Sequence, residues 1–142
     1  MNVWLRAALT VMGVFSLTLG TLHFFFPHLL DFKNAIPTAG TALKPFRIGP
    51  IRLATQRSDV HGIAWVMNHA ASYVLVSIGL LNLYWAYAGQ TNQLLALWIA
   101  GWWFLRAGSQ LYLGRRRGDW LVLIGFALLG ATHLLIGVSV SP

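Results

Sequence analysis

Residues 60–88 read VHGIAWVMNHAASYVLVSIGLLNLYWAYA and contain no Asp, Glu, Lys or Arg. A helix of about 20 apolar residues is long enough to cross a hydrocarbon core about 30 Å thick. The strands of a membrane β-barrel would instead be about 10 residues long and would alternate in polarity, which this stretch does not do. The sequence therefore predicts a transmembrane helix here.

Three further apolar stretches have the same character, and each contains at most one charged residue. The predicted spans are residues 3–26, 60–88, 94–113 and 120–140. The first resembles a secretory signal in carrying Arg6 ahead of an apolar run, but no small-residue cleavage site follows, so we expect a retained helix. The fold class predicted is all-α: a single domain over residues 1–142, an integral membrane four-helix bundle with a long basic loop over residues 27–59.

The composition excludes a water-soluble surface. Hydrophobic residues make up 57% of the chain and charged residues only 9%, whereas soluble domains carry about 25% charged residues. The absence of cysteine excludes disulfides and thiol-based redox or zinc sites. The net charge of +7 lies mainly between the spans and accompanies no groove-reading motif, so we predict the lipid bilayer as partner and no nucleic acid.

The distribution of positive charge predicts the orientation. With four spans, one face carries eight of the ten lysines and arginines, the other face carries only Arg6, and Arg106 lies within a span. The basic face holds Lys33, Lys44, Arg47, Arg52, Arg57, Arg115, Arg116 and Arg117. Since positively charged loops are retained in the cytoplasm, we predict a bacterial-type cytoplasmic (inner) membrane protein with cytoplasmic basic loops and both termini outside.

The loop over residues 27–59 is rich in proline, which removes backbone donors and restricts the residue before it. One continuous helix is therefore not expected there. The segments Phe46-Arg47-Ile48 and Ile51-Arg52-Leu53 alternate apolar and basic residues. This alternation predicts a short ribbon or a strip lying on lipid headgroups, and the alternative role is a cap over a binding site.

Polar groups inside the spans are candidates for function, because they are costly in lipid and tend to face the bundle interior. In the first span Gly13, Ser16, Gly20 and His23 form a stripe of small or polar residues, which predicts close packing against another helix. Depths estimated at 1.5 Å per residue place six residues in one cluster near the cytoplasmic face, with His133 in a different layer. The predicted ligand-binding residues are His23, His61, Asn68, His69, Arg106 and Gln110.

Arg106 is always charged, and a guanidinium in lipid requires a partner that accepts its hydrogen bonds. The chain has no Glu, and Asp31, Asp59 and Asp119 lie in loops or at span boundaries. The partner is then a neutral group, a carbonyl, Asp59 reached from the edge, or a bound ligand with oxygen acceptors such as a quinone or lipid headgroup. In the alternative interpretation, these side chains only form hydrogen bonds between helices, as in a structural or assembly subunit.

Histidine chemistry supplies further alternatives. Asp59, His61 and His28, with His23 nearby, carry oxygen and nitrogen donors of the kind that bind zinc or another first-row metal, although no two histidines lie three or four residues apart within a span. His23 and His69 are the one pair estimated to be near enough in depth for bis-histidine haem ligation. Proton-coupled export requires an acid within the membrane, and the spans contain none.

A short motif resembles a known family. The stretch Gly20-Thr21-Leu22-His23-Phe24-Phe25-Phe26-Pro27, followed ten residues on by Pro37, is similar to the end of the first helix in DoxX-like membrane proteins. The matched positions are Gly20, His23 and Pro27. The resemblance implies a small four-helix bundle associated with quinone-linked or thiol-linked redox systems, as in the membrane subunit of a thiosulfate:quinone oxidoreductase.

The long basic loop and the Asp59-x-His61 element depart from that family pattern. Our prediction from the sequence is a polytopic membrane protein with an inner-leaflet polar pocket for a quinone or lipid-like ligand. Such a protein would act as a subunit of a membrane redox complex or as a homo-oligomer, without independent catalytic activity. Haem and metal are the weaker cofactor alternatives.

Overall fold

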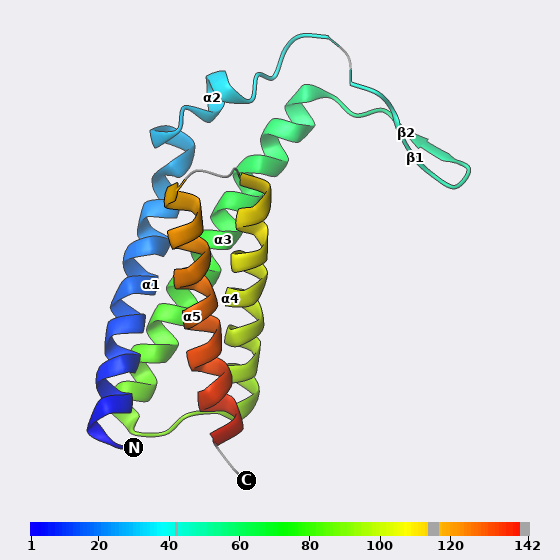
Figure 1. The fold of residues 1–142 in the computed structure, drawn as a ribbon. Coiled ribbons are helices and arrows are strands. Elements are labelled where there is room, and N and C mark those ends of the chain that lie inside the picture. Colours follow the sequence, from blue (N-terminus) through cyan, green and yellow to red (C-terminus); the bar gives the residue numbers. More distant parts are fainter. Residues whose placement is uncertain (42, 114–116, 140–142) are drawn as a thin grey trace. The chain divides into compact units, whose positions relative to one another are not determined.

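The computed structural model describes residues 1–41, 43–113 and 117–139. The predicted topology signals Arg115 and Arg116 lie outside the described residues. Four helices of seven or more residues confirm the all-α prediction, together with one short helix and one small hairpin (Figure 1). The elements are α1 Val3–Leu29, α2 Phe32–Ala35, β1 Phe46–Ile48, β2 Ile51–Leu53, α3 Arg57–Ala88, α4 Gln93–Leu113 and α5 Arg117–Ser139.

Three stretches among the described residues are long and apolar enough to cross a membrane: Val3–Leu29, Arg57–Ala88 and Gly118–Ser139. They correspond to three of the four predicted spans. The remaining span, residues 94–113, is confirmed as a helix by α4, and its crossing of the membrane stays a prediction. Length and composition thus support a multi-pass membrane protein.

The helices on either side of the long loop extend into residues 27–59 at both ends. Helix α1 continues through Pro27 to Leu29, although a proline inside a helix removes one hydrogen bond and crowds the carbonyl four residues earlier. Helix α3 begins at Arg57 instead of residue 60. Its first turn is stabilised by Asp59, whose Oδ2 accepts a hydrogen bond from the Gln56 backbone N–H at 2.8 Å, as in one half of a capping box.

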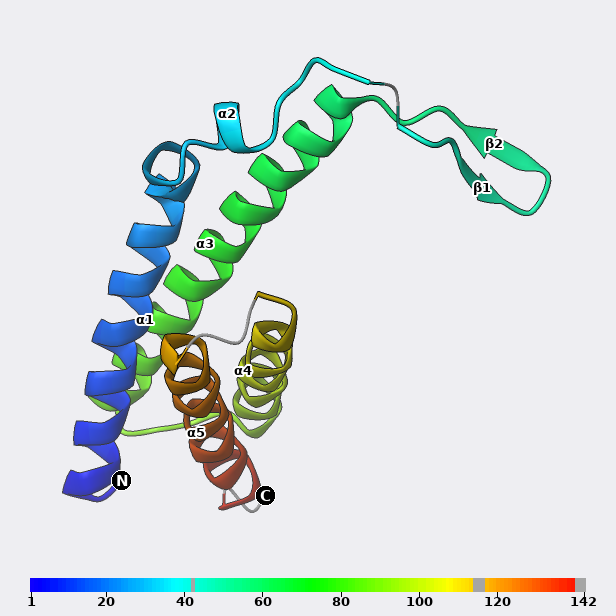
Figure 2. The same cartoon turned by 45° about the horizontal axis from the view of Figure 1, so that its top comes forward.

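The described contacts divide the chain into two compact units, of which one is Gly13–Leu83. In this unit α1 and α3 run side by side in opposite directions (Figure 2). A Cβ at Gly79 of α3 would lie 2.6 Å from Leu17 Cγ and 2.9 Å from the Gly13 carbonyl oxygen. A Cβ at Gly20 would lie 2.9 Å from Val76 Cγ2. The predicted close packing of the small residues of the first helix is therefore confirmed for Gly13 and Gly20.

The other unit comprises Met1–Met12 and Tyr84–Pro142 and contains α4 and α5. These helices pack against each other in opposite directions, with Gly130 of α5 against the Phe104 ring and Gly137 against Leu97. The fully buried Trp103 lies 5.2 Å from the Phe126 ring, centroid to centroid. Close contact at glycine again lets large apolar side chains fill the space between two helices.

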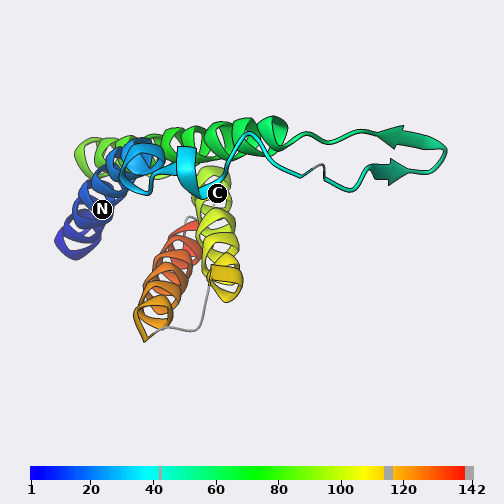
Figure 3. The same cartoon turned by 90° about the horizontal axis from the view of Figure 1, so that it is seen from above.

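The predicted ribbon in the loop is confirmed as a two-stranded antiparallel hairpin. Its register pairs Phe46 with Leu53, Arg47 with Arg52, and Ile48 with Ile51. Gly49 has a φ of +57° and precedes Pro50, whose ring fixes a negative φ. This is the sign pattern of a type II′ turn, one of the turns that match the twist of a two-residue hairpin. Figure 3 shows the hairpin extending beyond the first turn of α3.

Candidate functional site

Histidines and aromatic rings gather in the Gly13–Leu83 unit around Trp65 of α3. The His69 ring stacks on the Trp65 ring at an interplanar angle of 15° and a centroid distance of 5.7 Å. His28 meets the same indole edge-on at 5.4 Å, and His61 lies 6.2 Å away in a tilted arrangement. Because His61, Trp65 and His69 are spaced by four residues, the helical period places them on one face of α3.

Hydrogen bonds to backbone carbonyls fix the tautomers of two of these histidines. His69 Nδ1 lies 2.8 Å from the Trp65 carbonyl oxygen, and His61 Nδ1 lies 2.7 Å from the Ile36 carbonyl oxygen. A carbonyl oxygen only accepts, so Nδ1 carries the hydrogen in both rings. In the neutral ring, Nε2 is then a hydrogen-bond acceptor or a metal ligand. Among the described residues, no hydrogen bond to His69 Nε2 is found.

Asn68 connects α3 to α1 at a particular point of the backbone. Pro27 lacks the N–H that would otherwise bond to the carbonyl of His23, four residues earlier. The Asn68 side-chain amide donates a hydrogen bond to that His23 carbonyl oxygen. The His23 ring also approaches the same amide, with Nδ1 3.4 Å from Asn68 Oδ1. Asn68 and His23 thus satisfy each other across the helix pair, in line with the interhelical hydrogen-bond alternative for these two residues.

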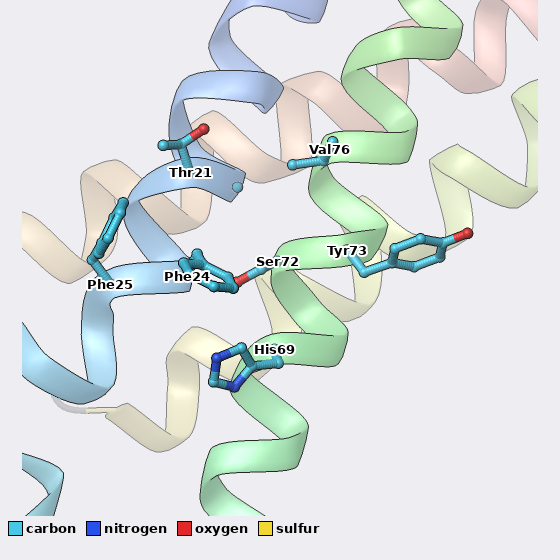
Figure 4. Close-up of a pocket in the computed structure, with 8 residues that line it drawn as sticks. Thr21, Phe24, Phe25, His69, Ser72, Tyr73 and Val76 are labelled. Atoms are coloured by element: carbon cyan, nitrogen blue, oxygen red, sulfur yellow. The ribbon is translucent and has the colours of Figure 1, made fainter.

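A groove of about 460 Å³ lies between α1 and α3 in the same unit (Figure 4). Phe24 of α1 lies beside Ser72 and His69 of α3, with its ring 5.0 Å from the His69 ring in an edge-to-face arrangement. The lining residues are Gly20, Thr21, Phe24, Phe25, His69, Ser72, Tyr73 and Val76. Apolar walls with few polar groups are typical of sites for small amphiphilic ligands.

Apart from the Tyr73 hydroxyl, which points away from Phe24 and His69 (Figure 4), the polar groups of the groove are acceptors. The Ser72 hydroxyl donates to the Asn68 carbonyl oxygen at 3.0 Å, and the Thr21 hydroxyl donates to the Leu17 carbonyl oxygen at 2.9 Å. Each of these two hydroxyls has used its hydrogen and keeps lone pairs on its oxygen. His69 Nε2 is an acceptor for the reason given above. The groove therefore matches a ligand that brings its own hydrogen-bond donor.

The remaining two predicted ligand-binding residues belong to the other unit. Arg106 of α4 lies over the Phe126 ring, with Cζ 5.8 Å from the ring centroid. The face of an aromatic ring carries partial negative charge and attracts a guanidinium. The Phe126 ring is therefore a partner of Arg106 that was not among those considered from the sequence. Gln110 is buried on the same helix. The predicted association of Arg106 and Gln110 with the other four residues stays a prediction.

The metal candidates have other neighbours. No group of three or more His, Cys, Asp or Glu side chains in the described ranges is placed to hold a metal ion. Asp59 caps the start of α3, and the rings of His28 and His61 pack against Trp65. For the haem alternative, the His23 ring packs on Phe26 at 4.4 Å, whereas the His69 ring contacts Phe24 and Trp65.

Sequence reasoning missed the aromatic residues that build this site. Trp65, Phe24 and Tyr73 shape the cluster and the groove, but aromatic side chains in an apolar span carry no signal of their own. The spacing of four residues between Trp65 and His69 was the available indication. Comparison of the chain with models of known protein families, with curated proteins and with solved structures found no match.

Proposed function

We propose that this multi-pass membrane protein binds a lipid-like ligand of the quinone class in the α1–α3 groove, with preference for the hydroxyl-bearing quinol. The observation that carries the proposal is His69: its Nδ1 hydrogen is held by the Trp65 carbonyl, which leaves Nε2 as an acceptor in a groove lined by Phe24, Phe25 and Tyr73. A quinol offers both a ring for these walls and a hydroxyl for His69.

Size and polarity support the same ligand class. The groove volume of about 460 Å³ falls within the range of about 300 to 1,000 Å³ typical of small-molecule sites. The exposed aromatic edges of the groove suit a molecule that arrives from the hydrocarbon phase. The resemblance of Gly20, His23 and Pro27 to DoxX-like proteins points to quinone-linked systems as well. We therefore place the chain as the ligand-binding subunit of a membrane redox complex whose redox chemistry belongs to partner subunits.

The test is binding of a short-chain hydroquinone to the detergent-solubilised protein, measured by equilibrium dialysis with quantitation by mass spectrometry. We expect His69→Phe to weaken binding at least about tenfold, since one hydrogen bond in a site of low polarity is worth about 1.4 kcal/mol. His28→Phe is the matched control, because His28 packs on Trp65 but does not line the groove. It should bind as the unmodified protein does.

Three results would contradict this proposal. Binding that is equally weak in both histidine variants would assign the effect to the aromatic cluster as a whole. Tighter binding of the oxidised quinone than of the quinol would show that His69 does not accept a hydrogen bond from the ligand. If no ligand of this class binds, the structural or assembly subunit becomes the better function, which the pairing of Asn68 with His23 favours.

We further propose that the loop between α1 and α3 is cytoplasmic and that both termini lie outside, in a bacterial-type cytoplasmic membrane. Support comes from the excess of positive charge in that loop. The chain has no cysteine, so single cysteines report without background. A membrane-impermeant maleimide applied to intact spheroplasts should label Gln90→Cys and spare Thr38→Cys until the cells are lysed. Labelling of Thr38→Cys before lysis, with Gln90→Cys protected, would show that the orientation is the reverse of the one proposed.

A further inference from the structure

The β1–β2 hairpin presents two chemically different faces. Residues directly opposite each other in an antiparallel pair project to the same side, and successive residues along a strand project to opposite sides. Arg47 is paired with Arg52, and Ile48 with Ile51. One face therefore carries two arginines and the other two isoleucines. The hairpin is an amphipathic element made of six strand residues.

Neither face has a partner suited to it in the neighbouring sequence. Like charges directly opposite each other destabilise a sheet, and no acidic residue occurs between Asp31 and Asp59 to offset Arg47 and Arg52. The apolar face is open as well, with Ile48 57% and Ile51 58% exposed. An external partner for this hairpin must then supply negative charge and an apolar phase together.

The place of the hairpin in the chain identifies that partner. Only residues 54–56 separate β2 from α3, so Leu53 lies within about 14 Å of chain length from the start of a candidate membrane span. Arg57, the first residue of α3, donates from Nε to the Thr41 carbonyl oxygen at 2.9 Å. This hydrogen bond joins the chain before the hairpin to the first residue of α3. Both ends of the loop that contains the hairpin therefore lie at the start of α3.

We propose that the hairpin binds the surface of an anionic lipid bilayer, with Ile48 and Ile51 in the interface and Arg47 and Arg52 on lipid phosphates. Amphipathic helices that lie in the interface use the same division between an apolar face and a basic face. Phosphates between the two arginines would also remove their mutual repulsion. The proposal does not depend on ligand binding in the groove.

The test uses the full chain in nanodiscs, spin-labelled at Ile51→Cys, with collision of the label measured against oxygen and against a water-soluble nickel chelate. In phosphatidylglycerol-rich discs we expect the label to be accessible to oxygen and protected from nickel. In phosphatidylcholine discs it should be open to nickel. Adding Arg47→Gln and Arg52→Gln should abolish the protection by anionic lipid.

The matched control is the pair Lys33→Gln and Lys44→Gln, which removes the same charge from exposed positions outside the strands. This pair should leave the protection intact. If the arginine pair and the lysine pair of substitutions reduce the protection equally, the effect depends only on net charge and the proposal is overturned. Protection that is the same in both lipids would overturn it too. Dipolar broadening between labels would show hairpins of two copies pairing with each other and would also overturn it.

Discussion

Gly79→Ala is expected to lower the free energy of unfolding by about 1 to 3 kcal/mol, the usual cost of overpacking a close contact. The added methyl group would lie 2.6 Å from Leu17 Cγ, 2.9 Å from the Leu17 nitrogen and 2.9 Å from the Gly13 carbonyl oxygen. Two of these three atoms belong to the backbone of α1. Rotation of a side chain therefore cannot relieve the clash, and the two helices must separate locally.

Gly62→Ala is the matched control on the same helix, because a Cβ at Gly62 meets nothing within 4 Å. It should be neutral or slightly stabilising, since alanine favours the helix by up to about 1 kcal/mol over glycine. Unfolding of both variants can be followed by tryptophan fluorescence during titration of mixed micelles with SDS. Equal stability of the two variants would mean that α1 and α3 do not pack at the distance seen here.

This contrast shows what the sequence could and could not predict. The stripe containing Gly13 and Gly20 follows from helical spacing alone, and it predicts that the first helix packs closely against another. Its partner, Gly79, is one of several glycines in long helices, and Gly62 looks equivalent to it in the sequence. Only the pairing of α1 with α3 in three dimensions separates a glycine in close contact from one in open space.

The candidate site was predictable in part for the same reason. Polar side chains are costly in lipid, and this cost identified His23, Asn68 and His69 in the sequence as candidate site residues. In the structure each of them has specific neighbours. Their roles differ, however, because Asn68 is held by the α1 backbone whereas His69 lines the groove. That difference depends on which atoms already have a partner, and residue type and depth do not encode it.

Pro27 illustrates how a local rule can fail for a physical reason. Sequence rules end a helix before a proline, and the first span was predicted to stop at residue 26. Helix α1 continues to Leu29 while the carbonyl of His23 accepts its hydrogen bond from Asn68 on another helix. Within a membrane an unsatisfied carbonyl is costly, and a donor from a neighbouring helix makes a proline tolerable.

Asn68→Leu is therefore expected to lower the free energy of unfolding by about 1 to 2 kcal/mol, because it removes the hydrogen bond that the Asn68 amide donates to the His23 carbonyl in an apolar setting. The same substitution should cost clearly less when Pro27→Ala is also present. Alanine at position 27 restores the backbone N–H, which then bonds to the His23 carbonyl within α1. The two substitutions should thus show a coupling energy of at least about 0.5 kcal/mol.

A double-mutant cycle measured by SDS titration tests this coupling, and Pro37→Ala provides the control cycle. Pro37 lies in the loop after α2, so its replacement restores no donor near His23, and its effect should add to that of Asn68→Leu. Additive effects in the Pro27 cycle would mean that the Asn68 amide is not the substitute donor for the missing N–H. Non-additive effects in the Pro27 cycle, together with additive effects in the Pro37 cycle, would show that the Asn68 amide allows α1 to continue past Pro27.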